Sequence, residues 1–579
     1  MENKVAKFSA GCPQIGLVGA FPHGDNSYST SNSLKWAPCD LDFPKETKGS
    51  ITVPIYCATL EVPLDYTSLD SERTIQLQLL KVNATKEPFK GSVIFNPGGP
   101  GNSGVEEVAL KGHTYRDVFG GQFDVIGFDP RGTGRTIPFV CDLGKDSKTS
   151  KSLSHRGNST ILPQDDAWSI LQSRAWSDGG WFADACYESQ KDTGRFLSTA
   201  FVARDMLRIV DSLDEDGKLR FWGRSYSTTL GQTFAAMFPD RIDRMLLDSV
   251  QIPEDYHSGQ WLTSTSGTQA SLLNFFSECV NAGPSLCPIA NFSGPETTPE
   301  DLMDAIAEVF QELRDQPIYL PDSYVSPLPQ PWWRLGKRPL LSELKYSILV
   351  FLYQPAQFPA LSMIISQALA RDWTGLTTPR PKVPAPEKWS KGANAFHGIG
   401  CADSSFRAKS PNDMYSLVQA ELAYSTFADA FMPQVWPCYQ WRFQAAEQFQ
   451  KVFENINTSY PIMFVNGAHD PITPLSGAWK AATAFYGSRL LVHNGHGHGV
   501  MNHPSECTIK AIGEYFANGT LPEQGMVCQP DMTGYELLKS ADANDVGGDV
   551  ETRSVRKTSL MEEVYAHART PSDSGVFGD

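Results

Sequence analysis

Short runs of apolar and β-branched residues recur near the start and near the end of this chain, and turn residues follow each run. Six runs predict strands: Ser92–Phe95, Phe123–Phe128, Leu219–Trp222, Arg244–Asp248, Pro461–Val465 and Arg489–Val492. Helical patterns lie between them. Strands that alternate with helices are typical of right-handed βαβ units, so we predict an α/β fold with a mostly parallel central sheet and helices on both faces.

This alternation stops after Val250 and resumes at Pro461. The intervening residues have helical patterns, as at Pro299–Arg314 and Asn412–Phe427, and proline-rich loops. An insertion at this point would lie over the carboxyl ends of the strands, where open α/β sheets bind ligands. We therefore predict a large, mainly helical cap domain.

The remaining segments complete the predicted domain organisation. Ala58–Val62 and Thr74–Val82 alternate in polarity, which suits a pair of antiparallel edge strands. The last residues are rich in Asp, Glu, Ser and Gly with little periodicity, which is typical of disorder. We predict an N-terminal extension (1–35), the first part of the α/β core (36–250), the cap (251–460), the second part of the core (461–529) and a disordered tail (530–579).

Composition narrows the class of protein. Among 579 residues, 41% are hydrophobic and 20% are charged, which fits a soluble globular chain. The formal net charge is -16 without a long basic run, which argues against nucleic acid as a partner. The longest apolar stretch, Tyr346–Tyr353, is far below the ~20 residues of a membrane span. We predict no membrane span, and the sequence does not indicate an oligomeric state.

Eleven cysteines and five glycosylation sequons point to an oxidising compartment. Cysteine spacing suggests the local pairs Cys39–Cys57, Cys141–Cys186, Cys279–Cys287, Cys401–Cys438 and Cys507–Cys528, with Cys12 left over. The sequons begin at Asn83, Asn158, Asn291, Asn457 and Asn518. The apolar stretch near Ile15–Phe21 is short and contains glycines, so it is no clear signal peptide. We nevertheless expect secretion or the secretory pathway.

The segment Gly223-Arg224-Ser225-Tyr226-Ser227 is the strongest chemical signal. It lies between a predicted strand and a predicted helix, the setting of a nucleophile elbow, where small residues must flank the serine at both second positions. Gly223 meets this need, whereas Ser227 departs from the usual glycine. We predict Ser225 as the nucleophile.

A glycine-rich loop, Asn96–Gly104, directly follows an early predicted strand. A tetrahedral intermediate carries negative charge on its oxygen, and backbone N–H groups must point at that charge. We predict Gly99 and Tyr226 as these oxyanion-hole donors. The loop lacks the Gly-Lys-Ser/Thr ending of a phosphate-binding loop.

The acid and base of this fold follow the serine along the chain. Asp470 stands in the turn after a predicted strand, a suitable place for the carboxylate that orients a histidine; His469 is its neighbour. Three histidines after the last strand, His493, His496 and His498, compete for the base, and spacing alone does not choose between them. A His-x-His pair without a third ligand makes a metal site improbable, and the chemistry requires no cofactor.

These motifs resemble the tripeptidyl aminopeptidase and prolyl iminopeptidase group of serine peptidases in the α/β-hydrolase superfamily. The resemblance extends from about Trp36 to Cys528. It rests on segments spread over the chain: 57–66, 96–104, 129–135, 204–206, 230–231, 238–239, 470–474, 497–499 and 525–528. By this resemblance His498 is the base, and the family's disulfides match the cysteine pairs proposed above. The family has glycine at the position of Ser227.

The resemblance implies a serine hydrolase that releases short peptides or residues from free N-termini through a Ser-His-Asp acyl-enzyme. An exopeptidase of this kind needs an acidic group in the cap for the substrate ammonium, and Glu254, Asp255 and Glu278 are candidates. An esterase or amide hydrolase acting on a small metabolite is the alternative, since one fold hosts many substrates. A catalytically inactive binding module is a second alternative.

Overall fold

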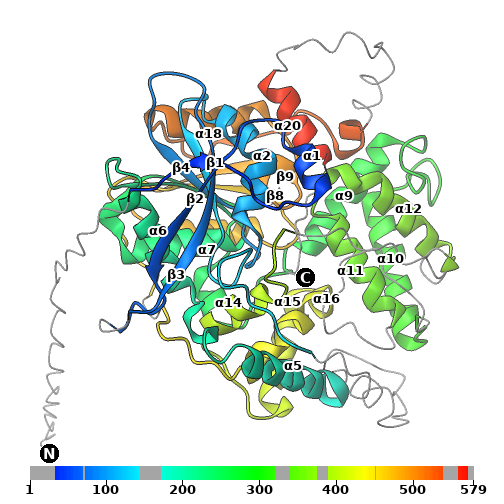
Figure 1. Cartoon of the computed structure of the whole chain (residues 1–579). Helices are drawn as coiled ribbons and strands as arrows, with labels where there is room; N and C mark the ends of the chain where they lie inside the picture. The colour runs from blue at the N-terminus through cyan, green and yellow to red at the C-terminus, as the bar shows by residue number, and fades with distance from the viewer. Residues whose placement is uncertain are drawn as a thin grey trace, which may run out of the picture.

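The computed structural model describes residues 33–68, 72–143, 168, 171–320, 339–374, 389–449, 452–538 and 559–570. A sheet of ten strands crosses the middle of this part of the chain in the order β1-β2-β3-β5-β4-β6-β7-β8-β9-β10 (Figure 1). The strands are β1 (Ala37–Pro38), β2 (Tyr56–Pro63), β3 (Thr74–Val82), β4 (Ser92–Asn96), β5 (Asp124–Phe128), β6 (Leu219–Arg224), β7 (Ile242–Asp248), β8 (Met463–His469), β9 (Arg489–His496) and β10 (Val527–Cys528).

The sheet is mostly parallel, as predicted. From β5 through β10 every neighbouring pair is parallel. β1, β2 and β3 are antiparallel to their neighbours and form one edge, which confirms the predicted edge pair; Ala58 there pairs with Leu79. Each of the six predicted runs overlaps a strand of this sheet, although Phe123, Pro461 and Ile462 precede theirs. The chain therefore has the predicted α/β fold, with β8 joined to β7 although the cap separates them in sequence.

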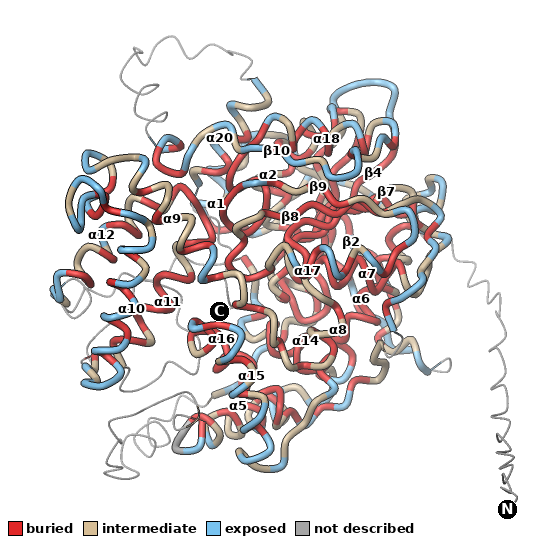
Figure 2. The backbone as a smooth tube through the Cα atoms, turned by 180° about the vertical axis from the view of Figure 1, so that it is seen from behind, coloured by how far each residue is buried: buried red, intermediate tan, exposed pale blue. Residues whose placement is uncertain are grey.

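Some helices cover the two faces of the sheet, and others lie beside it, chiefly in the insertion between β7 and β8. They are α1 (Lys45–Ser50), α2 (Gly104–Val118), α5 (Trp176–Ser189), α6 (Thr199–Ser212), α7 (Tyr226–Met237), α8 (Pro253–Ser258), α9 (Thr268–Ala282), α10 (Pro299–Asp315), α11 (Leu340–Phe351), α12 (Phe358–Leu369), α14 (Ala395–Asp403), α15 (Tyr415–Tyr424), α16 (Ala428–Val435), α17 (Leu475–Ala482), α18 (Glu506–Asn518) and α20 (Leu560–Arg569). Because side chains alternate along a strand, Phe221 packs towards α6 and α7, while Trp222 packs towards α2 and α18. The central strands β4, β5 and β6 are accordingly buried throughout, whereas the edge strands are partly exposed (Figure 2).

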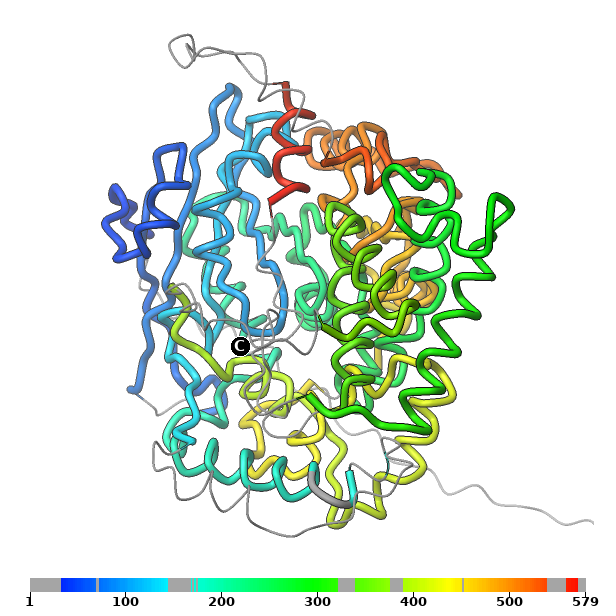
Figure 3. The backbone as a smooth tube through the Cα atoms, turned by 90° about the vertical axis from the view of Figure 1, so that its right-hand side faces the viewer, coloured from blue at the N-terminus to red at the C-terminus, as the bar shows by residue number. Residues whose placement is uncertain are grey.

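The helices between β7 and β8 form two groups, each with its own apolar core. α9, α10, α11 and α12 pack on one another beside the sheet (Figure 3). α14, α15 and α16 pack with α5, a helix from the segment between β5 and β6 (Figure 1). The predicted domain boundaries stay a prediction, and α5 lies with the cap helices although its sequence falls within 36–250.

Part of the predicted disordered tail is ordered, so that expectation was wrong for this part. Residues 560–569 form α20, which starts with a capping box from Ser559 and packs on α2. Val564, His567 and Ala568 are buried, a spacing that places them on one helix face. Residues 539–558 and 571–579 lie outside the described residues, as do 1–32, which include Cys12 and Ile15–Phe21.

Five disulfides join the cysteines in the five predicted pairs. Of the sequon asparagines, Asn291, Asn457 and Asn518 are exposed, Asn83 is half-buried, and Asn158 lies outside the described residues. Within the described ranges, none of the helices has both the length and the apolarity needed to cross a membrane.

Candidate active site

Ser225 alone joins strand β6 to helix α7. β6 ends at Arg224 and α7 begins at Tyr226. The backbone of Ser225 has φ 60° and ψ −128°, a conformation that is unfavourable for a residue with a side chain. A sharp, strained turn of this kind presents the nucleophile of an α/β hydrolase above the sheet.

The residues that flank Ser225 fit this turn for different reasons. A Cβ on Gly223 would lie 2.5 Å from a ring carbon of Phe221 and 2.5 Å from the carbonyl oxygen of Ser227, so only glycine fits. Ser227 is fully buried, and its Oγ donates a hydrogen bond to Asn96 Oδ1 at the end of β4. The unusual serine therefore ties the first turn of α7 to the loop that follows β4.

That glycine-rich loop packs directly on the serine turn. A Cβ on Gly98 would lie 2.4 Å from the carbonyl oxygen of Arg224 and 3.1 Å from the amide nitrogen of Tyr226. Gly98 and Gly99 have φ of 96° and 108°, a region that favours glycine, and Gly99 lines the same cavity as Ser225. Tyr226 is the first residue of α7, so its amide has no acceptor inside that helix. Both predicted oxyanion donors thus lie beside the serine.

Asp470 follows β8 and is buried. Its Oδ1 accepts hydrogen bonds from the amides of Ile472 and Thr473 at 3.0 and 2.9 Å. Its Oδ2 accepts one from Thr473 Oγ1 at 2.8 Å and lies 2.9 Å from His498 Nδ1. The carboxylate is therefore held by its own turn and oriented towards this imidazole. Thr473 Oγ1 also lies 3.2 Å from His498 Nδ1, a contact that the sequence pattern did not suggest.

The two glycines beside His498 allow the loop after β9 to pack closely. A Cβ on Gly497 would lie 2.6 Å from the carbonyl oxygen of Tyr353, and one on Gly499 would lie 2.8 Å from the side chain of Arg224. Both glycines have positive φ. The amide of His498 donates to the same Tyr353 carbonyl at 2.9 Å. Backbone packing therefore fixes the imidazole that faces Asp470.

The competing histidines have other partners. His493 Nδ1 lies 3.0 Å from Thr508 Oγ1, and His496 Nε2 lies 3.2 Å from a carboxylate oxygen of Glu278. The ring of His469 packs on that of His496, with centroids 4.8 Å apart. Burial lowers the pKa of His469 to about 4 and that of His493 to about 3, so both are neutral at neutral pH.

Ser225 and His498 line one cavity at the carboxyl ends of the central strands, and His498 is the histidine among its described lining residues. Within the described chain, no hydrogen bond joins their side chains; in free enzymes this contact often tightens only when substrate binds. Trp261, Tyr353, Phe396, Phe431 and Ile472 also line this cavity, together with polar side chains such as Gln251 and Ser264. The arrangement can perform nucleophilic attack on a carbonyl.

Asp248, at the end of β7, was not predicted. Its carbonyl oxygen accepts the Ser225 amide at 3.0 Å, and its Oδ1 accepts the Val500 amide at 3.2 Å. Burial raises the pKa of Asp248 to about 6, although the nearby Arg224 guanidinium and His498 oppose the shift. The sequence signal that could have found Asp248 was its position at the carboxyl end of a predicted strand, where α/β sheets place functional side chains.

The carboxylates considered for a substrate amine differ in their surroundings. Asp255 accepts hydrogen bonds from residues 262–263, and Glu278 is paired with His496, while Glu254 forms neither kind of contact with the described residues. Glu421 on α15 was not singled out from the sequence, although its spacing of three residues from Val418 places both on one face of the helix. It is 3% exposed, its Oε2 has no hydrogen-bond partner among the described residues, and burial, aided by nearby Asp255, raises its pKa well above the usual value.

Known proteins are similar to this chain over most of its length. Residues 91–320 match the family model described as alpha/beta hydrolase fold, and residues 424–528 match the one described as TAP-like protein. Tripeptidyl aminopeptidase of Streptomyces lividans is 25% identical, covering 86% of this chain and 87% of that protein. Serine protease Hip1 of Mycobacterium tuberculosis is 26% identical, covering 86% and 91%. Carboxylesterase B of the same organism is 24% identical, covering 82% and 86%.

The two matched regions contain Ser225 in the first and both Asp470 and His498 in the second. They therefore include strands β4–β7 before the cap and β8–β10 after it. From its fold, from the side chains gathered at its cavity and from these similarities, the chain is a peptidase-like serine hydrolase with the α/β-hydrolase fold, similar to tripeptidyl aminopeptidase and to serine protease Hip1.

Proposed function

We propose that this protein is an exopeptidase that releases short peptides or residues from free N-termini, with Ser225 as nucleophile, His498 as base and Asp470 as the carboxylate that orients it. The position of His498 carries the proposal. Its Nδ1 lies 2.9 Å from Asp470, which leaves Nε2 as the ring nitrogen available to the cavity that Ser225 lines.

The reaction follows in two steps. Ser225 Oγ attacks the scissile carbonyl while His498 Nε2 takes the hydroxyl proton, and the amides of Gly99 and Tyr226 stabilise the oxyanion. The C–N bond then breaks, His498 gives that proton to the leaving amine, and an ester to Ser225 remains. Water, deprotonated by His498, hydrolyses this ester and restores the serine.

The cavity wall favours a substrate with an apolar side chain in the acyl part. Trp261, Phe396 and Phe431 come from the segment between β7 and β8 and line the same cavity as Ser225. Burial of one such side chain contributes about 1.5–3 kcal/mol. A compact apolar residue next to the scissile bond fits this wall.

We propose Glu421 as the group that binds the substrate ammonium. A buried carboxylate without a cation is unfavourable, and an arriving ammonium would relieve this by favouring the ionised form. The next helix, α16, carries Phe431 into the cavity lining. Glu421→Gln should raise KM for free-amine peptides and leave ester hydrolysis unchanged, with Glu447→Gln, which disrupts a partly exposed ion pair to Arg204, as matched control.

We also propose that the protein acts in an oxidising compartment, as a secreted or secretory protein. Five disulfides support this, because thiols of cytosolic proteins are kept reduced. Exposed sequons at Asn291, Asn457 and Asn518 are accessible to glycosylation. A mass shift removed by an amidase specific for N-glycans would test this on protein from the native source.

The test of the proposed activity uses matched peptides with free and acetylated N-termini, analysed by mass spectrometry. Cleavage of the free peptides alone establishes an exopeptidase, and the masses give the length of the released unit. Ser225→Ala should lower kcat by on the order of 10⁶. Ser212→Ala, at the far end of α6, is the matched control and should be as active as the wild type.

The esterase alternative makes the opposite prediction. Hydrolysis of simple p-nitrophenyl esters with no cleavage of either peptide set would contradict the peptidase proposal. That result would assign the chain to the activity named for its carboxylesterase relative. Hydrolysis of neither class by a folded protein would favour an inactive binding module.

A further inference from the structure

Asp403 is a buried carboxylate outside the proposed triad. It is the last residue of α14 and is 2% exposed. Its Oδ1 accepts the amide of Thr199 at 2.8 Å, and its Oδ2 accepts Thr199 Oγ1 at 2.6 Å and Tyr256 Oη at 2.8 Å. Within the described chain it forms no ion pair with a Lys, Arg or His. Since a buried carboxylate without a cation is unfavourable, its presence calls for a role.

The hydrogen bonds of Asp403 continue to the residue after the proposed nucleophile. Tyr226 Oη lies 2.6 Å from Thr199 Oγ1, and both side chains are buried. A hydroxyl has one proton, which Thr199 gives to Asp403, so Thr199 must accept from Tyr226. The carboxylate therefore fixes the direction of the whole chain, from Tyr226 through Thr199 to Asp403.

These hydrogen bonds hold the side chain of Tyr226 at its phenolic hydroxyl, far from the backbone amide of the same residue. The amide follows Ser225 at the start of α7 and is a proposed oxyanion donor, while the phenol is anchored on the first residue of α6. A donor must lie within a few tenths of an ångström of the developing oxyanion, because misplacement by about 1 Å can reduce the rate on the order of 10²-fold. Anchoring the phenol restricts such movement of the amide.

Asp403 also supports the apolar wall of the cavity. Tyr256, which donates to it, packs against Trp261 with ring centroids 5.0 Å apart, and Trp261 lines the cavity. Tyr226 and Tyr256 are themselves adjacent, with centroids 5.4 Å apart. Asp403 is thus connected through Thr199 to Tyr226, the residue of a proposed oxyanion donor, and through Tyr256 to Trp261, which lines the cavity.

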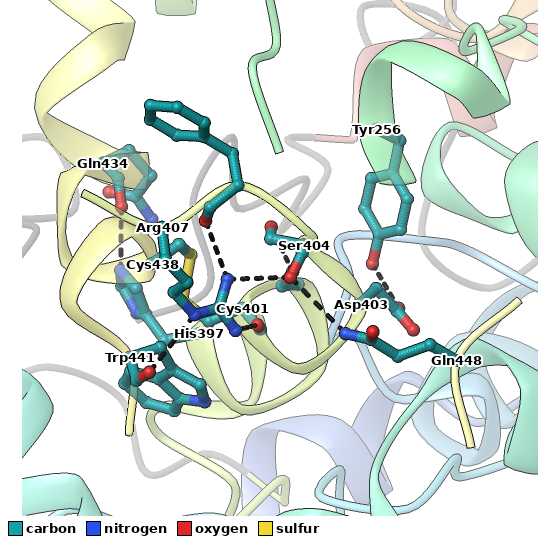
Figure 4. The surroundings of a disulfide bond; sticks show 12 residues. Tyr256, His397, Cys401, Asp403, Ser404, Arg407, Gln434, Cys438, Trp441 and Gln448 are labelled. Carbon is teal, nitrogen blue, oxygen red and sulfur yellow. Dashed lines mark hydrogen bonds between the residues drawn. A yellow bond between two sulfur atoms is a disulfide. The ribbon is translucent and has the colours of Figure 1, made fainter. Parts of the chain in front are cut away.

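The end of α14 is held rigidly from the cap side (Figure 4). A disulfide joins Cys401 to Cys438. Arg407 donates to the carbonyl oxygens of Cys401 and Ser404 at 2.9 and 2.7 Å, and Gln448 donates to that of Ala402 at 2.7 Å. Figure 4 shows Asp403 on the other side of this helix end, pointing to Tyr256. The Asp403 carboxylate is therefore held in place from the cap side, and its hydrogen bonds to Thr199 and Tyr256 connect α14 with α6 and α8.

We propose that Asp403 is a positioning residue for acyl transfer: through Thr199 it fixes Tyr226, and thereby the amide that stabilises the oxyanion formed at Ser225. This inference rests on the proposed role of Ser225. The ionised carboxylate accepts from all three donors, whereas the protonated acid must itself donate a proton and has no acceptor among these contacts.

Titration of Asp403 supports the inference. Burial raises its pKa to about 7, against the hydrogen bonds from Thr199 and Tyr256. The titratable groups around it are the phenols of Tyr226 and Tyr256, and burial raises the pKa of each well above its usual value, so neither ionises near neutral pH. Protonation of Asp403 should therefore reduce activity below about pH 7, in addition to protonation of the base.

The experiment compares Asp403→Asn with Glu447→Gln on a p-nitrophenyl ester and on a free-amine peptide. The side-chain amide that Asp403→Asn introduces donates a hydrogen bond where the carboxylate accepted one, so Thr199 Oγ1 loses its acceptor. Thr199 then donates to Tyr226 instead of accepting from it, and the direction of these hydrogen bonds reverses. We expect kcat per active site to fall about 10- to 100-fold, with KM within about threefold of the wild type. The decline of kcat/KM below pH 7 should become less steep, and Glu447→Gln should change none of these values.

A double-mutant cycle tests whether Asp403 acts through Tyr226. Tyr226→Phe removes the phenolic hydroxyl and keeps the amide, so it should lower kcat to a similar extent, and the double variant should be no slower than the slower single variant. Additive losses would overturn the inference. So would an unchanged kcat in Asp403→Asn, or an effect confined to KM.

Active sites are counted by titration of Ser225 with a fluorophosphonate, so that misfolded protein does not affect kcat. If Asp403→Asn does not fold, Thr199→Val serves instead, because it interrupts the chain and keeps the carboxylate; a normal kcat there overturns the inference. A wild type that hydrolyses neither peptide nor ester refutes the proposed function itself. An active wild type with an unaffected Asp403→Asn refutes only the role of Asp403.

Discussion

The hydroxyl of Ser227 offers a direct test of how the serine turn is stabilised. Its Oγ donates to Asn96 Oδ1, which also accepts the Gly98 amide at 3.1 Å, so one amide side chain links α7 to the glycine-rich loop. Ser227→Ala removes only this hydrogen bond, and Ser227→Gly also adds backbone freedom. We expect a loss of about 1 kcal/mol of unfolding free energy for alanine. Glycine should cost roughly 0.5–1 kcal/mol more.

These losses are measured as shifts of Tm by near-ultraviolet circular dichroism at one fixed scan rate. In a large chain a kilocalorie shifts Tm by on the order of 2 °C, so the expected order is wild type, then Ser227→Ala, then Ser227→Gly. Both variants should lower kcat alike, by less than about tenfold, because both release the loop that carries Gly99.

A Ser227→Gly protein as stable and as active as the wild type would refute this reasoning. It would mean that glycine, the residue usual at this position in the related family, is the better fit here and that the bond to Asn96 contributes nothing. The Asn96→Ala background is the control, because Ser227→Ala should have little further effect once the acceptor is gone.

Two further predictions concern the surroundings of the triad. Thr473→Val removes a buried hydrogen bond to the Asp470 carboxylate, worth about 1.5–3 kcal/mol, so kcat should fall about 10- to 100-fold with KM little changed; an unchanged kcat in steady-state kinetics would contradict this. The pKa of Asp248 is about 6 in the folded protein and about 4 in the unfolded chain. Between these two values the folded state therefore binds more protons than the unfolded state, so the free energy of unfolding falls as the pH rises from about 4 to 6. Asp248→Asn should reduce that slope in Tm measured against pH, and an unchanged slope would assign it to another group.

The strands and the serine turn could be predicted because their signals are local. Apolar runs such as 245–247 are buried on both faces of a parallel sheet, so successive positions are apolar instead of alternating with polar ones. Gly223 lies in β6 and Ser225 is the one residue that joins β6 to α7, and the need for a small residue two positions before the serine follows from the turn itself. The cysteine pairs were also local in sequence.

The choice among His493, His496 and His498 needed more than spacing. All three lie in or just after β9, where side chains alternate and the strand ends in a glycine-rich loop. The structure separates them by their partners, since Thr508, Glu278 and Asp470 come from three different elements. Periodicity along one strand contains no information on which of these elements lies opposite.

Local patterns in the sequence thus determined the parallel sheet, the strand-serine-helix turn and the residue types for acyl transfer, because each depends on neighbours within a few residues. Tertiary structure alone decided that α20 docks on α2, that α5 joins the cap helices and that Asp403 reaches Tyr226 through Thr199. Asp403 and Tyr226 are far apart in sequence, and a buried carboxylate gains its meaning only from the donors that folding places around it.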